Sequence, residues 1–297
     1  MQRFEGLAPR LAEGSEDVAI YRRAGEAILA GEVPYRDFFI EYPPGSLPAF
    51  VPPALFSESR EAYASLFASE MALVLVAALV LTAYAARSLG RSRLLPAAVF
   101  TAAAILLYPV AVTRYDAVLA LSFAAAVTFA SVPTSRKSTA SSAELVSAWT
   151  SLGFGVAAKL VPALATLPLA LFAGHGGRAF GGAIRGFAVF CGVVAAFRVP
   201  AIFFGGAGFV KSFTYHADRG LQLESVASSV LMKLGYVDGT FFAFGAVDVR
   251  GRGVELLSSL SLPVTGLLLA VTGRRIASIV RGVSGRDGFH ASRRRSC

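Results

Sequence analysis

The sequence predicts an all-α fold: a polytopic bundle of about seven transmembrane helices, with amphipathic helices in its outer loops. Three observations predict this class. Of the 297 residues, 55% are hydrophobic and only 16% are charged, whereas soluble domains average about 25% charged residues. The apolar residues form runs long enough, as helices, to cross a hydrocarbon core of ~30 Å. Lys and Arg gather at the ends of these runs, which is typical of membrane topology.

The net charge of +9 favours membrane lipids as partners. The basic residues flank apolar runs, where they meet anionic headgroups. We expect no nucleic acid partner, because no basic recognition helix or aromatic stacking platform accompanies the charge. The sequence has no His or Cys group with metal-ligand spacing and no phosphate-binding glycine loop. Neither a metal nor a cofactor is therefore expected.

A polar, aromatic-containing head is expected over residues 1–62, before the first apolar run. Within it, residues 15–31 predict an amphipathic helix. Ser15 is a suitable N-cap, Asp17 suits the first turn, and Gly31 suits the C-terminal stop. A helix of this kind lies on a membrane surface.

The spans are expected at 64–86, 94–112, 116–132, 143–173, 186–204 and 254–273. The segment 143–173 is too long for one ordinary span and too short for two full ones. Lys159 and Pro162 interrupt it. We therefore expect a helical hairpin with short arms there, which brings the total to about seven crossings.

The topology follows from the positive-inside rule, which places the Arg clusters at 87–93, 136–137, 178–185 and 274–295 in the cytoplasm. The polar segments then face away from the cytoplasm and are placed to build one site together. We expect a multi-pass plasma membrane protein with one domain, 1–275. It divides into an outer head loop (1–62), membrane helices (63–204), an outer loop (205–253) and a last span (254–275), and a basic cytoplasmic tail (276–297) follows.

The outer head carries a recognisable motif. Asp17-x-x-x-Tyr21 is followed by "GEVPYRDFFIEYPPG" from Gly31 to Gly45. This arrangement resembles the first outer loop of glycosyltransferase family 87, a member of the GT-C superfamily of polytopic sugar transferases. Three later stretches support the resemblance: "YPVAVTRYDAVLAL" (108–121), "GFGVAAKLVPALATLPLAL" (153–171) and "SFTYHADRGLQLESV" (212–226). Family members carry a membrane helix before the Asp and more spans near the end, so the chain is expected to be shortened at both ends.

The resemblance implies a GT-C-like fold and transfer of a sugar, typically mannose. The donor would be a polyprenyl-phosphate sugar, and the acceptor a lipid or a glycan. In such enzymes the active site faces away from the cytoplasm, and an acid in the first outer loop is the catalytic base. Asp17 is the residue at the matching position. The lipid-linked sugar is a substrate, so the expectation of no cofactor stands.

This reaction needs a carboxylate to accept the hydroxyl proton and cations to bind the leaving phosphate. A single displacement would invert the anomeric centre. We expect Asp17 to be the base. The substrate-binding candidates are Asp37, Glu41, Tyr42, Arg114, Asp116, Lys159, His216 and Arg219.

Seven of these nine candidates also have a structural interpretation. Asp17 is equally typical of a helix start, where it interacts with the helix dipole. The two loop acids, Asp37 and Glu41, suit pairing with a neighbouring arginine. Lys159 within an apolar stretch needs a partner, either phosphate, outer headgroups or Asp116. Arg114 and Asp116 suit an interface ion pair, and His216 a surface position.

Two non-enzymatic alternatives remain open from the sequence. One is a small transporter or flippase, and the other is a degenerate subunit of a complex that assembles cell-envelope glycans. A transporter should show internally related halves and interrupted helices near the middle of the membrane. The sequence has one evident break, at Lys159 and Pro162.

Overall fold

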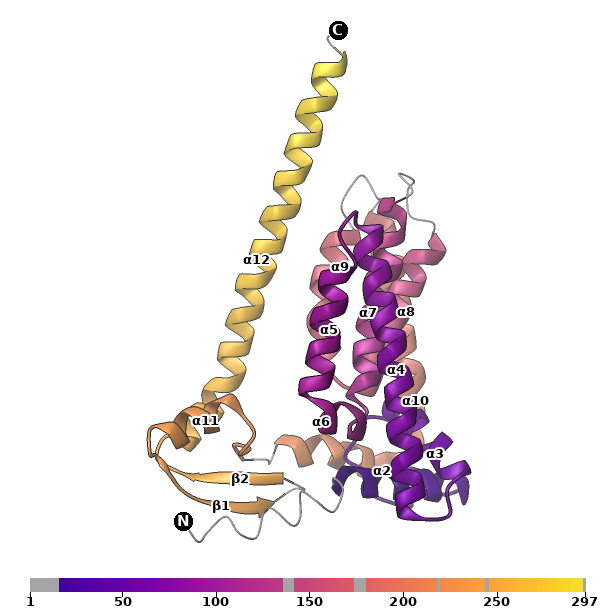
Figure 1. The fold of residues 1–297 in the computed structure, drawn as a ribbon, viewed down its shortest axis with the longest axis vertical. Coiled ribbons are helices and arrows are strands. Elements are labelled where there is room, and N and C mark those ends of the chain that lie inside the picture. Colours follow the sequence, from indigo (N-terminus) through magenta and orange to yellow (C-terminus); the bar gives the residue numbers. More distant parts are fainter. Residues whose placement is uncertain (1–15, 136–141, 174–179, 218–219, 244–245, 296–297) are drawn as a thin grey trace. The chain divides into compact units, whose positions relative to one another are not determined.

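The computed structural model describes residues 16–135, 142–173, 180–217, 220–243 and 246–295 (Figure 1). Helices make up 77% of the structure, so the predicted helical character is confirmed. The chain divides into two compact units, residues 1–209 and 210–297.

The first unit is helical throughout its described elements. In chain order they are α2 (Glu16–Leu29), η1 (Pro44–Ala49), α3 (Val51–Leu55), α4 (Arg60–Ser88), α5 (Leu94–Leu106), α6 (Tyr108–Thr113), α7 (Asp116–Ser135), α8 (Ser142–Ala158), η2 (Val161–Ala165), α9 (Thr166–Ala173) and α10 (Phe180–Ala217), which continues into the second unit. α2 confirms the predicted amphipathic helix, since Val18, Tyr21 and Ala24 are buried while Arg23 is exposed.

Within the described ranges, three helical segments are long and apolar enough to cross a membrane: Arg60–Ser88, Ile184–Tyr215 and Val254–Arg275. Shorter apolar helices cover Leu94–Leu106, Asp116–Ser131 and Val161–Ala170. These lengths and compositions indicate a membrane protein. The total of seven crossings and the side of the membrane that each loop faces stay predictions.

α4 shows how one membrane helix serves two environments. It begins after Ser59, whose hydroxyl accepts a hydrogen bond from the Ala62 backbone N–H at 3.1 Å, as an N-cap does. Phe67 and Met71 are fully buried against other helices, whereas Leu73 is 72% exposed. A helix that is apolar on its exposed face as well as its packed face suits lipid surroundings.

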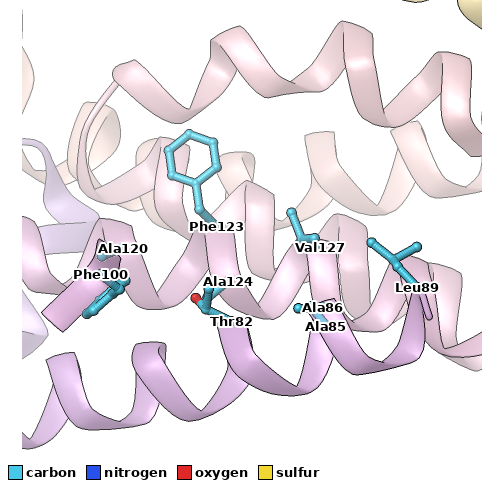
Figure 2. A pocket seen from close by; sticks show the side chains of 9 residues that line it. All are labelled: Thr82, Ala85, Ala86, Leu89, Phe100, Ala120, Phe123, Ala124 and Val127. Carbon is cyan, nitrogen blue, oxygen red and sulfur yellow. The ribbon is translucent and has the colours of Figure 1, made fainter. Parts of the chain in front are cut away.

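α4 and α7 run side by side in the same direction. Near one end, Ala117 of α7 belongs to the same apolar cluster as Phe67 and Met71. Farther along, the Thr128 hydroxyl donates to the Leu81 carbonyl of α4 at 3.0 Å. These two contacts fix the register of the helices, which together with Phe100 of α5 line an apolar pocket of about 390 Å³ (Figure 2).

The interrupted segment at 143–173 is confirmed as two helical arms with a break. α8 ends at Ala158, and Lys159 and Leu160 separate it from η2 and α9. Both arms contribute to one apolar cluster, α8 through Trp149 and α9 through Leu169. α8 also packs on α7, where the Ser122 hydroxyl donates to the Ser151 carbonyl at 2.5 Å.

The head before the first long apolar helix is built on aromatic packing and close backbone contact. The Tyr21 and Phe50 rings stack with centroids 4.3 Å apart and planes 10° from parallel. Gly45 packs directly on the end of α8. A Cβ there would lie 2.5 Å from the Ala158 backbone nitrogen. Since no real Cβ contact is that short, glycine is required for η1 to rest beside Lys159.

The second unit corrects the all-α prediction. It contains α11 (Val226–Lys233), β1 (Val237–Ala243), β2 (Ala246–Gly251) and α12 (Val254–Arg295). β1 and β2 form an antiparallel pair. Residues 220–223 extend it, because the Leu221 carbonyl accepts from the Val249 N–H at 2.9 Å and the Leu223 N–H donates to the Val247 carbonyl at 2.8 Å.

Candidate active site

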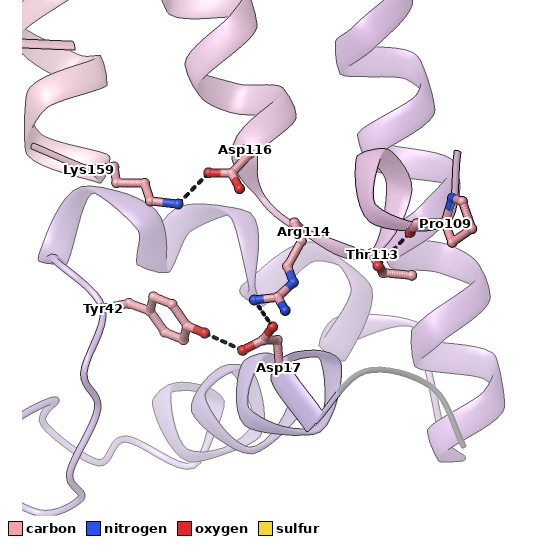
Figure 3. A network of polar contacts seen from close by, with 7 residues as sticks. All are labelled: Asp17, Tyr42, Pro109, Thr113, Arg114, Asp116 and Lys159. Carbon is pink, nitrogen blue, oxygen red and sulfur yellow. Dashed lines mark hydrogen bonds and ion pairs between the residues drawn. The ribbon is translucent and has the colours of Figure 1, made fainter. Parts of the chain in front are cut away.

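Asp17 lies in the first turn of α2 and is only 8% exposed. Tyr42 of the head loop donates its hydroxyl hydrogen to Asp17 Oδ1 at 2.6 Å. Arg114, from the corner between α6 and α7, forms an ion pair with Oδ2 through Nη1. Figure 3 shows the three side chains meeting from three separate segments. Both oxygens of the carboxylate are therefore engaged.

The corner between α6 and α7 aims Arg114 at this carboxylate. α6 ends at Thr113, whose hydroxyl donates to the Pro109 carbonyl at 2.6 Å. Arg114 itself has extended backbone (φ −118°, ψ 141°), and α7 begins two residues later at Asp116. Because the helix stops before Arg114, its side chain leaves the helical direction and meets α2 (Figure 3).

A second ion pair lies directly beyond this corner. Lys159 Nζ donates to Asp116 Oδ1 at 2.6 Å, and both side chains are half-exposed. The Lys159 ammonium also lies 5.5 Å from the centre of the Tyr115 ring, a cation–π distance. Of the partners considered for Lys159, the structure supplies Asp116. An exposed pair of this kind contributes little to stability, about 0–1 kcal/mol. Lys159 can therefore leave Asp116 and bind a ligand with little loss of stability.

Tyr115 separates the two ion pairs and is 2% exposed. Its ring meets those of Tyr21 and Tyr42 edge to face, with centroids 5.8 and 5.4 Å away. Burial raises the pKa of the Tyr42 hydroxyl well above its usual range, and the Asp17 carboxylate adds to that shift. Tyr42 therefore keeps its proton at physiological pH and remains a hydrogen-bond donor to Asp17.

Asp37 belongs to a separate, local arrangement. Its carboxylate accepts from Arg36 Nη2 at 2.9 Å and from the Val33 N–H at 2.8 Å. These hydrogen bonds, that from Arg36 first, lower the pKa of Asp37 to about 2. In this geometry Asp37 is a loop acid paired with a neighbouring arginine, which is the structural interpretation given above.

Glu41 differs from Asp37 in being buried, with 7% of the residue exposed. It adjoins Tyr42 in the chain. Burial is the main cause of the raised pKa of Tyr42 and Tyr115, and the Glu41 charge contributes to both. The acid thus lies within electrostatic reach of the cluster around Asp17.

The two candidates from the polar segment 205–253 are not placed at the site. The backbone of His216 lies near the end of α10, and its side chain and the whole of Arg219 lie outside the described residues. The expected convergence of this segment with the head stays a prediction.

Sequence reasoning missed several residues around Asp17. The aromatic wall of the cluster consists of Tyr21, Phe50 and Tyr115. For Tyr21, the sequence signal that could have identified it was the spacing Asp17-x-x-x-Tyr21. Glu70 of α4 was also passed over, although a lone acid in an apolar span is a functional signal. Its buried Oε2 has no hydrogen-bond partner among the described residues.

The groups available for chemistry at this cluster are two carboxylates, Asp17 and Asp116, and two cations, Arg114 and Lys159. Asp17 can accept a proton, and Arg114 and Lys159 can bind an anion. In the described part of the chain, no three His, Cys, Asp or Glu side chains lie close enough to hold a metal ion.

Comparison with known proteins gives one family. The model of glycosyltransferase family 87 matches residues 39–283, most of the chain. The match includes Tyr42, Arg114, Asp116 and Lys159 and begins after Asp17. No curated protein and no solved structure gives a significant match.

Proposed function

The chain belongs to glycosyltransferase family 87, and from this premise we propose that it transfers mannose from a polyprenyl-phosphate donor to a lipid or glycan acceptor. Family membership makes it a glycosyltransferase, with a sugar donor and an acceptor. The proposed location is the non-cytoplasmic side of the plasma membrane. The observation that carries the proposal is the position of Asp17 between Tyr42 and Arg114, beside the Asp116–Lys159 pair.

The two cations favour a lipid-linked phosphate as the donor group. Asp116 begins an apolar helix that runs to Ser131, so Arg114 and Lys159 lie where such a helix meets the headgroup region. The phosphate of a lipid carrier lies at this depth. The planar guanidinium of Arg114 matches two phosphate oxygens at once, and Lys159 adds a compact charge. Their charges stabilise the phosphate as it leaves.

The ion pair at Asp17 implies an order of events. Arg114 is engaged by Asp17 Oδ2. We propose that the donor phosphate competes for Arg114 and so frees this oxygen. Tyr42 continues to hold Oδ1 and keeps the carboxylate oriented. The base is then available only when a donor is bound.

The transfer itself is a single displacement. The acceptor hydroxyl gives its proton to Asp17 Oδ2, and its oxygen attacks the anomeric carbon from the face opposite the phosphate. The bond between that carbon and the phosphate oxygen breaks, and polyprenyl phosphate leaves with the electron pair, held by Arg114 and Lys159. The anomeric configuration inverts. Asp17 later returns its proton to solvent.

The donor class can be tested with the purified chain in phospholipid vesicles. We expect labelled mannose to pass from polyprenyl-phosphate mannose to a lipid or glycan acceptor in a membrane extract, and not from nucleotide-linked mannose. Heat-denatured protein is the control. Transfer from the nucleotide donor alone would contradict the proposed donor. Transfer of another sugar from the same carrier would revise the sugar and keep the donor class.

A further inference from the structure

Tyr35 of the head loop has a backbone conformation that residues with a side chain rarely adopt. Its φ is 68°, and among the described residues it is the one non-glycine residue with a positive φ. In a bulky residue this conformation is uncommon, and it persists only where the surrounding contacts impose it. Tyr35 is also buried, with 5% of the residue exposed. The contacts that Tyr35 makes therefore indicate what this conformation serves.

A bend in α10 receives Tyr35. The helix is interrupted at Gly206, whose φ of 51° and ψ of −127° are not helical. A Cβ on Gly205 would lie 2.7 Å from the Tyr35 Cβ, and one on Gly208 would overlap the Tyr35 carbonyl oxygen. The Tyr35 ring meets that of Phe209 edge to face, with centroids 5.3 Å apart. Gly205, Gly208 and Phe209 thus form a glycine notch, which the backbone and the ring of Tyr35 occupy.

The Tyr35 hydroxyl reaches the residue that holds the candidate base. It donates a hydrogen bond to the Tyr42 carbonyl at 2.7 Å. Burial raises the pKa of the Tyr35 hydroxyl above its usual range, so the group keeps its proton and remains a donor. Tyr42 lies outside the helices and strands, so secondary structure does not hold its backbone, whereas Tyr35 does. Tyr42 in turn donates to Asp17 Oδ1 at 2.6 Å (Figure 3).

We propose that Tyr35 is a positioning residue for the base, and that the glycine notch of α10 holds Tyr35 in place. The proposal rests on the proposed function, in which Asp17 takes the acceptor proton and Tyr42 orients its carboxylate. Aromatic contacts with Tyr21 and Tyr115 hold the Tyr42 ring from its sides. The hydrogen bond from Tyr35 fixes the backbone from which that ring extends. Because a misplacement of about 1 Å can lower a catalytic rate by about 10²-fold, both supports bear on the rate of transfer.

A double-mutant cycle on kcat tests whether Tyr35 acts through Tyr42. Tyr35→Phe removes the hydroxyl and keeps the ring against Phe209. We expect it to lower kcat about tenfold, near the upper value for one hydrogen bond, and to change KM for polyprenyl-phosphate mannose by less than about twofold. Tyr42→Phe keeps the carbonyl that accepts from Tyr35 and removes the donor to Asp17. In that background Tyr35→Phe should lower kcat no further.

Two results of the cycle would overturn the proposal. One is an unchanged kcat in Tyr35→Phe, which would mean that aromatic packing alone positions Tyr42. The other is a double variant in which the two losses multiply, because Tyr35 would then act on the rate independently of Tyr42. A residue that only supports the fold would show this second result.

Fluorine NMR gives a readout that needs no sugar transfer. The full chain is prepared in phospholipid nanodiscs with 3-fluorotyrosine in place of Tyr42, so that one fluorine resonance reports the surroundings of this ring. We expect Tyr35→Phe to shift or split the resonance, while the thermal unfolding midpoint shows that the variant folds. The same resonance with and without the Tyr35 hydroxyl would contradict the proposal.

Matched glycine variants test the notch in the same spectra. Gly208→Ala places a methyl group where the Tyr35 carbonyl lies, whereas Gly192→Ala adds one to the same helix with nothing within 4 Å. We expect Gly208→Ala to move the resonance of position 42 and Gly192→Ala to leave it in place. No effect from Gly208→Ala, or an equal effect from both, would contradict the role of the notch. If the unaltered chain used no lipid-linked donor, the proposed function would fail, and the fluorine spectra would still decide whether Tyr35 positions Tyr42.

Discussion

Replacing Asp17 with Asn is expected to abolish sugar transfer, lowering kcat by about 10²–10⁴-fold, the usual contribution of a general base. The amide cannot take the proton of the acceptor hydroxyl. Its oxygen can still accept the hydrogen bond from Tyr42, so the head should keep its packing. The measurement is the single-turnover rate from polyprenyl-phosphate mannose, with thermal unfolding recorded on the same preparation.

Asp37→Asn is the matched control in the same head. Asp37 is held by Arg36 and Val33 in a local arrangement that does not include Asp17 among its hydrogen-bond partners. Since the folded-state pKa is depressed to about 2, the stabilising interaction is present above the ordinary pKa near 4 and is lost only as the pH falls toward 2. The residue thus stays ionised at every working pH. Transfer and its pH profile should change by no more than about twofold, as for other surface positions. Full activity in Asp17→Asn with loss in Asp37→Asn would reverse the assignment.

Replacing Arg114 with Met is expected to weaken the binding of polyprenyl phosphate at least tenfold and to lower the free energy of unfolding. The phosphate loses one of two cations. Asp17 keeps its charge in a buried position with its ion-pair partner gone, which costs about 1–3 kcal/mol, between the values for exposed and buried pairs. Titration with polyprenyl phosphate and thermal unfolding measure the two effects. Arg114→Lys keeps the charge and removes the planar fork, so it should bind phosphate with intermediate affinity.

The double variant Asp17→Asn with Arg114→Met separates stability from chemistry. Removing both charges leaves no unpaired ion, so the free energy of unfolding should recover toward that of the unaltered chain. Transfer should not recover. Non-additive stability of this kind is what a directly interacting pair shows in a double-mutant cycle. Wild-type affinity for polyprenyl phosphate in Arg114→Met alone would contradict the role given to this residue.

Local features of the first unit were predictable from the sequence. The helical spacing of apolar residues in α2 and its polar start depend only on residues close together in the chain. The length of α4 likewise follows from one continuous apolar run. Both helices lie where expected. The break at Lys159 was visible for the same reason. The pairing of Arg114 was not: the sequence offers Asp116 two residues away, and the structure supplies Asp17, because the end of α6 turns Arg114 toward α2. Such a contact depends on the packing of distant segments.

The strands of the second unit show a different limit. Residues 237–251 carry Phe and Gly that also suit membrane packing, so no strand was expected there. β-propensity depends strongly on what a strand pairs with. Here β2 pairs with β1. It also pairs with residues 220–223, which come earlier in the chain, before α11. The partner of a strand is settled by tertiary structure, which the local pattern does not contain.

The affinity of Asp17→Asn for polyprenyl phosphate tests most directly the claim that Asp17 and the donor phosphate compete for Arg114. The asparagine amide binds the guanidinium far more weakly than a carboxylate, so Arg114 becomes available to the phosphate. We predict that the Kd falls several-fold below that of the unaltered chain, although the variant no longer transfers sugar. An equal or higher Kd would contradict the claim.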